Sequence, residues 1–238
     1  MHDARPRIAI LVGGIGMSSA DTEAAVETLP AAVSLAVSPY AADLSRLISD
    51  IRAHGHEVLI AVPMEPEGSP LNDPDNTLAL MTSLPEEENL KRLRAVLEKA
   101  DGAAGATNLA GPIRGERLMQ EADMFAGVLR EVAGRGMFFL DTADRAATAR
   151  DRSADIMLDE APLDGSALDD RLDRLTQIAR RRGMAVGAIA LPRPIVLERL
   201  GTWSRLLNTK GVTLVPVGAL FSASPEVRNT ASAAEEGR

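Results

Sequence analysis

Short apolar runs alternate along the chain with longer segments in which apolar residues recur at helical spacing. The runs are almost uniformly apolar and do not alternate with polar residues, which is typical of strands buried on both faces of a parallel sheet. We therefore predict strands over residues 8–12, 33–37, 58–62, 106–108, 137–140, 156–158, 186–190 and 213–217.

The segments between these strands carry amphipathic patterns. Leu44, Leu47, Ile48 and Ile51 share one helix face, and the segments 90–97, 118–132 and 168–179 repeat this spacing. Several predicted helices stop at a glycine before the next strand, which is a frequent helix terminator. These glycines are Gly55, Gly136, Gly183 and Gly211. The arginines 180–182 suit a helix C-terminus, where cations interact favourably with the helix dipole.

The repeated strand–helix unit predicts an α/β fold with right-handed crossovers. Seven or eight such units within residues 7–221 favour one closed barrel-like domain, and an open doubly wound sheet is the alternative. Residues 1–6 are then an N-terminal tail and 222–238 a disordered C-terminal tail. Residues 64–84 read as a long strand-to-helix loop that could act as a lid.

Composition narrows the class of protein. Lysine and arginine number 26 against 34 aspartates and glutamates, so the net charge is −8, which argues against a nucleic-acid partner. The absence of cysteine excludes disulfides and thiolate metal sites. We find neither an apolar stretch long enough to span a membrane nor a signal-peptide pattern in the chain as given.

In a barrel of this kind the reacting groups lie at the C-terminal ends of the strands. The candidate cleft is therefore lined by Gly13, Gly14, Ser38, Tyr40, Glu65, Asn108, Asp141 and Arg193. Gly14 and Gly16 form the start of a dinucleotide motif, but the third glycine position is Ser19. We accordingly expect no nicotinamide cofactor, and predict a tight turn capped by Ser18 or Ser19.

Few residues of this cleft could perform acid–base or metal chemistry. His54 and His56 precede the third predicted strand, at the opposite end of the barrel, and are expected to be helix-end and surface residues. Glu65 and Asp141 are the carboxylates at strand C-ends, so only they are candidate catalytic groups. Asp141 could equally cap the loop that follows it.

The ordered fragments of the chain resemble the divergent polysaccharide deacetylases. They are Ile8-Ala-Ile-Leu-Val-Gly-Gly-Ile-Gly, Leu35-Ala-Val-Ser-Pro-Tyr-Ala, Gly55-His-Glu-Val-Leu-Ile-Ala-Val-Pro-Met-Glu-Pro, Gly105-Ala-Thr-Asn-Leu-Ala-Gly, Phe139-Leu-Asp-Thr, Leu191-Pro-Arg-Pro and Gly211-Val-Thr-Leu-Val-Pro-Val. This resemblance covers residues 7–221 and implies a distorted barrel of seven strand–helix units, the (β/α)7 type.

The resemblance also implies a set of metal ligands that this chain lacks. Family members carry two aspartates after the first strand, where this chain has Gly13 and Gly14. An Asn-His pair is replaced by Asn108-Leu109, and a Gly-His-Pro by Ala190-Leu191-Pro192. We therefore expect no metal or other cofactor, and the two glycines should leave extra volume beside Asp141.

These departures predict a polysaccharide deacetylase-like pseudoenzyme. In the former active-site cleft it would bind an envelope polysaccharide, a peptidoglycan fragment or an envelope protein. The alternative is a working carbohydrate deacetylase that hydrolyses amide C–N bonds through Glu65 and Asp141. The resemblance implies an extracytoplasmic, periplasmic location.

Overall fold

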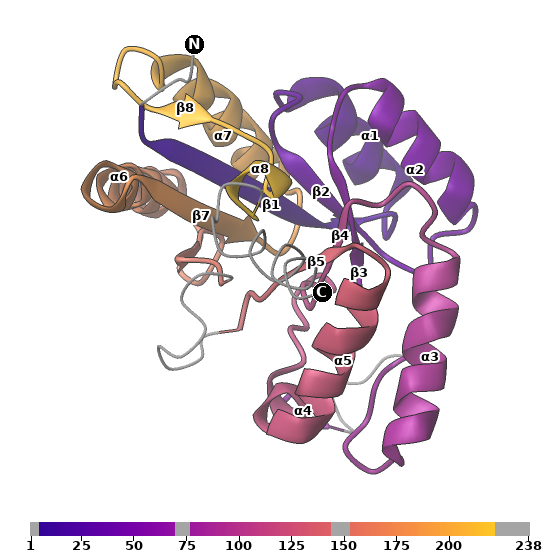
Figure 1. Ribbon diagram of the computed structural model, residues 1–238. Helices are drawn as coiled ribbons and strands as arrows, with labels where there is room; N and C mark the ends of the chain where they lie inside the picture. Colours follow the sequence, from indigo (N-terminus) through magenta and orange to yellow (C-terminus); the bar gives the residue numbers. More distant parts are fainter. Residues whose placement is uncertain (1–4, 70–76, 144–152, 222–238) are drawn as a thin grey trace, which may run out of the picture.

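The computed structural model describes residues 5–69, 77–143 and 153–221. Parallel strands in these ranges follow the order β5-β4-β3-β2-β1-β7-β6, and β8 pairs with the N-terminal end of β1 (Figure 1). All eight predicted strands are present, which confirms the α/β interpretation. They are β1 (Arg7–Ile15), β2 (Ser34–Val37), β3 (Val58–Ala61), β4 (Gly105–Thr107), β5 (Phe138–Leu140), β6 (Ile156–Met157), β7 (Met184–Ile189) and β8 (Thr213–Leu214).

A helix follows each strand except β5 in the described part of the chain. The helices are α1 (Ser19–Thr28), α2 (Leu44–Ala53), α3 (Glu86–Glu98), α4 (Glu116–Gln120), α5 (Ala122–Gly134), α6 (Gly165–Arg182), α7 (Pro194–Leu206) and α8 (Gly218–Phe221). The single helix expected over 118–132 is wrong, because Glu121 has a ψ of 89° and separates α4 from α5. Gly183 ends α6 with a φ of 82°, directly after the three arginines, as predicted.

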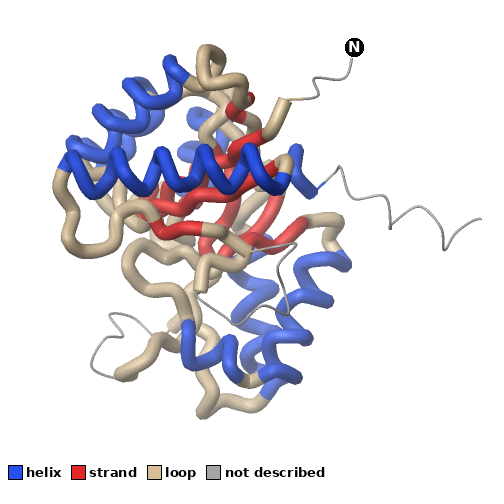
Figure 2. Tube along the Cα trace, turned by 90° about the vertical axis from the view of Figure 1, so that its left-hand side faces the viewer, coloured by secondary structure: helices blue, strands red, loops and turns tan. Residues whose placement is uncertain are grey.

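Alternate residues of each strand face opposite sides of the sheet. Ile8, Ile10 and Val12 belong to a core with residues from all the helices α1 to α7, whereas Ala9 and Leu11 pack with the inward residues of other strands. The inner cluster is completed by Val217 and Leu220 at and within α8. Helices therefore cover one face of the sheet, and the sheet is curved so that its other face points inward (Figure 2).

The curled sheet forms a half-barrel consistent with a distorted (β/α)7 barrel. Its edge strands β5 and β6 approach each other through one bridge between Asp141 and Ser153. A doubly wound sheet would place helices on both faces, so this alternative is excluded for the described residues. The boundaries 7–221 stay a prediction, and residues 1–4 and 222–238 of the two predicted tails lie outside the described residues. Within the described part of the chain, no helix has the length and apolar character needed to cross a membrane.

The two histidines before β3 have different environments. His54 ends α2 and is exposed, as predicted. His56 is buried, so its prediction as a surface residue is wrong. Only one residue separates it from β3, and its ring enters the layer beneath α1, with Nδ1 2.9 Å from the carbonyl oxygen of Val33 and Nε2 3.2 Å from that of Val26.

Candidate functional site at the strand C-termini

Two leucines fill the centre of the predicted cleft. A Cβ at Gly13 would lie 2.9 Å from Leu109 Cγ, and a Cβ at Gly14 would lie 2.8 Å from Leu191 Cδ2. Both distances are shorter than carbon atoms tolerate in a packed interior. The prediction of extra volume beside Asp141 is therefore wrong, because the space that the glycines leave is occupied by these side chains.

We call Gly13, Gly14, Leu109 and Leu191 the apolar plug. Gly13 and Gly14 lie within β1, at the point where its pairing with β2 shifts register. Gly14 also has a φ of 72°, a backbone conformation that favours glycine. Leucines from the ends of β4 and β7 thus contact β1. Their side chains occupy the volume that the two glycines leave free.

An aspartate that the sequence analysis did not select holds one leucine of the plug. Asp159 follows β6, and its carboxylate accepts hydrogen bonds from the backbone N–H groups of Ala190 (2.9 Å) and Leu191 (3.2 Å). These bonds tie the end of β7 to the loop after β6. The available signal was an acid directly after the sixth predicted strand.

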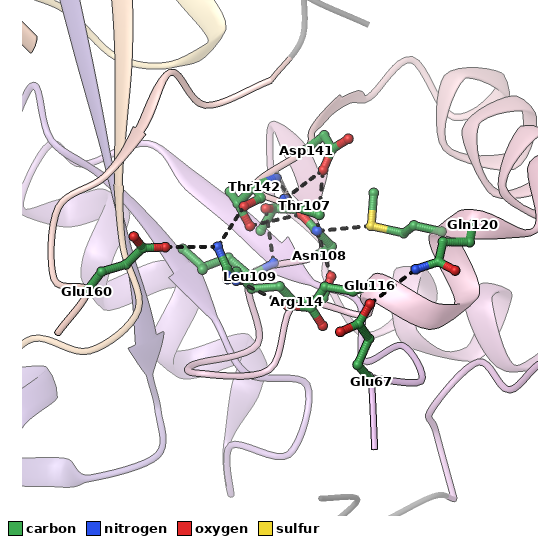
Figure 3. A network of polar contacts seen from close by, with 12 residues as sticks. Glu67, Thr107, Asn108, Leu109, Arg114, Glu116, Gln120, Asp141, Thr142 and Glu160 are labelled. Atoms are coloured by element: carbon green, nitrogen blue, oxygen red, sulfur yellow. Dashed lines mark hydrogen bonds and ion pairs between the residues drawn. The ribbon is translucent and has the colours of Figure 1, made fainter. Parts of the chain in front are cut away.

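Asn108 is the centre of a buried polar network beside the plug (Figure 3). Its Nδ2 donates to the carbonyl oxygen of Arg114 at 2.7 Å and lies 3.5 Å from Asp141 Oδ1. Its Oδ1 accepts from both the backbone N–H (2.8 Å) and the hydroxyl (3.1 Å) of Thr142. Asn108 therefore joins the ends of β4 and β5 through contacts that stabilise the loops.

Asp141 makes the loop-capping contact that was one of its two predicted roles. Its Oδ1 accepts from the backbone N–H of Ala143 at 2.8 Å, which is the geometry of an Asx turn. Arg114, which the sequence analysis missed, donates to the carbonyl oxygen of Thr142 at 3.3 Å and pairs with Glu116 at 3.2 Å (Figure 3). The network organises the backbone around Asp141.

Glu65 belongs to a different set of contacts. Its Oε2 accepts from the backbone N–H of Thr82 at 2.6 Å, and its Oε1 lies 3.2 Å from Arg117 Nε. It is buried and holds together the two ends of the predicted lid and α4. Residues 70–76 of that loop lie outside the described residues, so the lid stays a prediction.

The remaining predicted residues lie on the outer rim of the same sheet edge. Ser38 and Tyr40 follow β2, with Ser38 Oγ accepting from the Tyr40 backbone N–H at 3.3 Å, and the exposed Arg193 precedes α7. Met17, which was not predicted, follows β1 and is 59% exposed, while Tyr40 is 42% exposed. Because β2, β1 and β7 are neighbours, the segments that carry Tyr40, Met17 and Arg193 leave adjacent strands at this edge of the sheet.

The site does not fit the metal that the fold family implies. Among the described residues, no group of three or more histidines, cysteines, aspartates or glutamates could hold a metal ion. The positions of the expected aspartates and histidines form the apolar plug, whose glycine Cβ positions are blocked by leucine carbons. Zinc sites use about three or four nitrogen, oxygen or sulfur ligands, and the plug offers none from a side chain.

The model of the divergent polysaccharide deacetylase family matches residues 10–221. This chain belongs to that family. It also resembles the crystal structure of an uncharacterized protein, ATU2773 from Agrobacterium tumefaciens C58, with a TM-score of 0.82 and 31% sequence identity over 91% of this chain and 89% of that chain. No curated protein matches the chain.

Proposed function

We propose that this divergent polysaccharide deacetylase is a non-catalytic binding protein. The observation that carries the proposal is the apolar plug, which occupies the positions where the family resemblance implies metal ligands. Metal-assisted amide hydrolysis needs a Lewis acid that activates water and polarises the carbonyl group. Leucine and glycine side chains supply neither function.

The two carboxylates that could support an alternative hydrolytic mechanism are held in structural contacts. Asp141 Oδ1 bonds to the Ala143 backbone, and Glu65 bonds to the Thr82 backbone and pairs with Arg117. A general base must reach the proton that it removes, with a free lone pair aimed at the substrate. These contacts favour binding over hydrolysis.

We place the binding surface on the rim formed by Tyr40, Met17 and Arg193. An exposed aromatic ring can stack on the apolar face of a sugar, and a guanidinium can pair with a carboxylate of a peptidoglycan fragment. The candidate ligand is therefore an envelope glycan that carries carboxylates, and an envelope protein is the other ligand class. An extracytoplasmic location is part of this proposal and is supported by family membership alone.

The first experiment measures zinc per purified chain and acetate release from an acetylated glucosamine oligomer. We expect substoichiometric zinc and no turnover. Near-stoichiometric zinc, with acetate release abolished by Asp141→Asn, would overturn the proposal and establish the hydrolase alternative.

The second experiment measures binding of soluble peptidoglycan fragments by calorimetry. Tyr40→Ala and Arg193→Ala should each weaken binding by about tenfold or more. Met184→Ala is the matched control, because Met184 is 40% exposed at the opposite end of β7. Equal affinities for the native chain and its three variants would show that the rim is not the binding surface. Absence of binding by the native chain would reject the glycan as ligand.

A further inference from the structure

A groove of about 500 Å³ runs between α1 and α2, on the helix-covered side of the sheet. The α1 wall consists of residues 19, 22, 23, 26 and 27, and the α2 wall of residues 43, 46, 47, 50, 51 and 54. Both sets follow the three- and four-residue spacing of one helix face, so each helix presents a full stripe to the groove. At one end the groove reaches Gly16 and Ala41, the sequence neighbours of Met17 and Tyr40 on the rim.

The two helices on either side of the groove make few contacts with each other. The pairs α3 and α5, α6 and α7, and α1 and α7 contact each other more extensively than α1 and α2 or α2 and α3 do. The helices follow the neighbouring parallel strands β1 and β2, so their axes run in the same direction. A helix lying in the groove would pack against both of them.

The floor of the groove is apolar. Val26 from α1, Leu47 and Ile51 from α2, and Ala41 just before α2 line it. Val26, Leu47 and Ala41 are only partly buried, so they retain apolar surface that a partner could cover. Removing such surface from water favours binding of an apolar partner face.

The walls above this floor are acidic. Four carboxylates, Glu23, Glu27, Asp43 and Asp50, face one guanidinium, Arg46, which itself lies 3.6 Å from Asp50 Oδ2. The charge balance of these five side chains is therefore −3. An acidic wall on each side of an apolar floor is complementary to a helix with one apolar stripe flanked by lysine or arginine.

We propose that the groove between α1 and α2 binds a basic amphipathic helix of a protein partner. Ten-residue walls span about 15 Å, which accommodates apolar anchors at positions i, i+3 or i+4, and i+7 of the partner helix. Basic side chains beside those anchors reach the carboxylates on both walls. This inference stands independently of the ligand proposed for the rim.

The probe is a fluorescein-labelled peptide of about 14 residues, with leucines on one stripe and lysines elsewhere, and a counterpart with glutamate at every lysine position. Fluorescence anisotropy with the full chain at about 0.15 M salt measures affinity. We expect saturable binding of the lysine peptide and none of the glutamate peptide. Absence of saturable binding of the lysine peptide overturns the proposal.

Two charge-reversal pairs locate the binding. The double variant Glu23→Lys/Glu27→Lys should bind the lysine peptide with an affinity lower by about tenfold or more. Asp101→Lys/Asp170→Lys makes the same charge change at exposed positions outside the groove and should alter affinity less than about twofold. Equal losses in the two variants mean that the peptide responds to net charge alone, and the groove is then not the site.

A third variant separates the contribution of apolar burial to peptide binding from the contribution of charge. Val26→Glu adds a negative charge to the groove but removes an apolar floor residue, so the proposal expects weaker binding by about fivefold or more. Circular dichroism checks that the variant keeps its helix content. Stronger binding by Val26→Glu would identify a purely electrostatic contact and overturn the helix-in-groove arrangement.

Discussion

Gly13→Ala tests whether the plug is packed as tightly as its distances indicate. The new Cβ would meet Leu109 Cγ at 2.9 Å, Leu109 Cδ2 at 3.0 Å and the carbonyl oxygen of Ala190 at 3.1 Å. Leu109 is fully buried and the carbonyl belongs to the backbone, so neither can move away freely. Overpacking of this kind costs about 1–3 kcal/mol of folding free energy.

A double-mutant cycle with Leu109→Ala measures the contact itself. Leu109→Ala alone should cost about 2–5 kcal/mol, because it leaves a cavity in a fully buried position. In the double variant the Cβ of residue 13 occupies part of that cavity and no longer meets the leucine. The combined loss should therefore fall short of the sum of the single losses by about 1–2 kcal/mol, within the range for residues in contact.

Urea unfolding followed by tryptophan fluorescence provides the assay. Trp203 is buried in α7, and its Nε1 donates to Thr176 Oγ1 at 3.3 Å, so its emission reports on the folded core. Gly201→Ala is the control, because its Cβ would lie no closer than 3.9 Å to Arg205 Nη1 within the same helix, and it should stabilise by up to about 1 kcal/mol. Native-like stability of Gly13→Ala, or strict additivity in the cycle, would refute the packing argument.

Two further substitutions test other contacts by denaturation. Asp159→Ala removes the acceptor of two backbone N–H groups, including that of Leu191, and should lower the unfolding free energy by about 1–3 kcal/mol; a neutral result would make this anchor dispensable. A hydrogen bond from Arg94 holds the pKa of Glu131 below its usual 4.5, so its stabilisation is present above that value and is lost as the pH falls through the lower folded-state pKa. Glu131→Gln should flatten that acid-side loss of stability, and an unchanged pH profile would contradict it.

The architecture was predictable because it follows from local patterns repeated along the chain. Uniformly apolar runs identified the buried strands, and glycine after several of the helices marked where the chain turns back. The break at Glu121 was not predictable in this way, because the apolar spacing continues through it from Leu118 to Phe125. The spacing of apolar residues indicates which face of a helix is buried, but it does not indicate where the backbone leaves the helical conformation.

The site was only partly predictable, because its decisive contacts join residues far apart in sequence. The sequence itself shows that Gly13 and Gly14 stand where the family resemblance implies ligands. Which side chains fill their place depends on how the ends of β4 and β7 approach β1. The burial of His56 has the same origin, since its ring contacts two carbonyls from residues more than twenty positions earlier. Which side chains fill a given space depends on tertiary contacts, and a single sequence does not reveal these contacts.

The plug changes what the loss of metal ligands means physically. If the ligands alone had been lost, a cavity would remain, and restoring aspartate at position 13 would restore a ligand. Instead, Leu109 occupies the space that an aspartate side chain needs, and the positive φ of Gly14 disfavours any side chain at the next position. Restoring a metal site therefore requires coupled changes on β1, β4 and β7, together with a new backbone conformation at position 14. A scaffold packed in this way resists the return of a metal site by single substitutions, which supports the binding role that we propose.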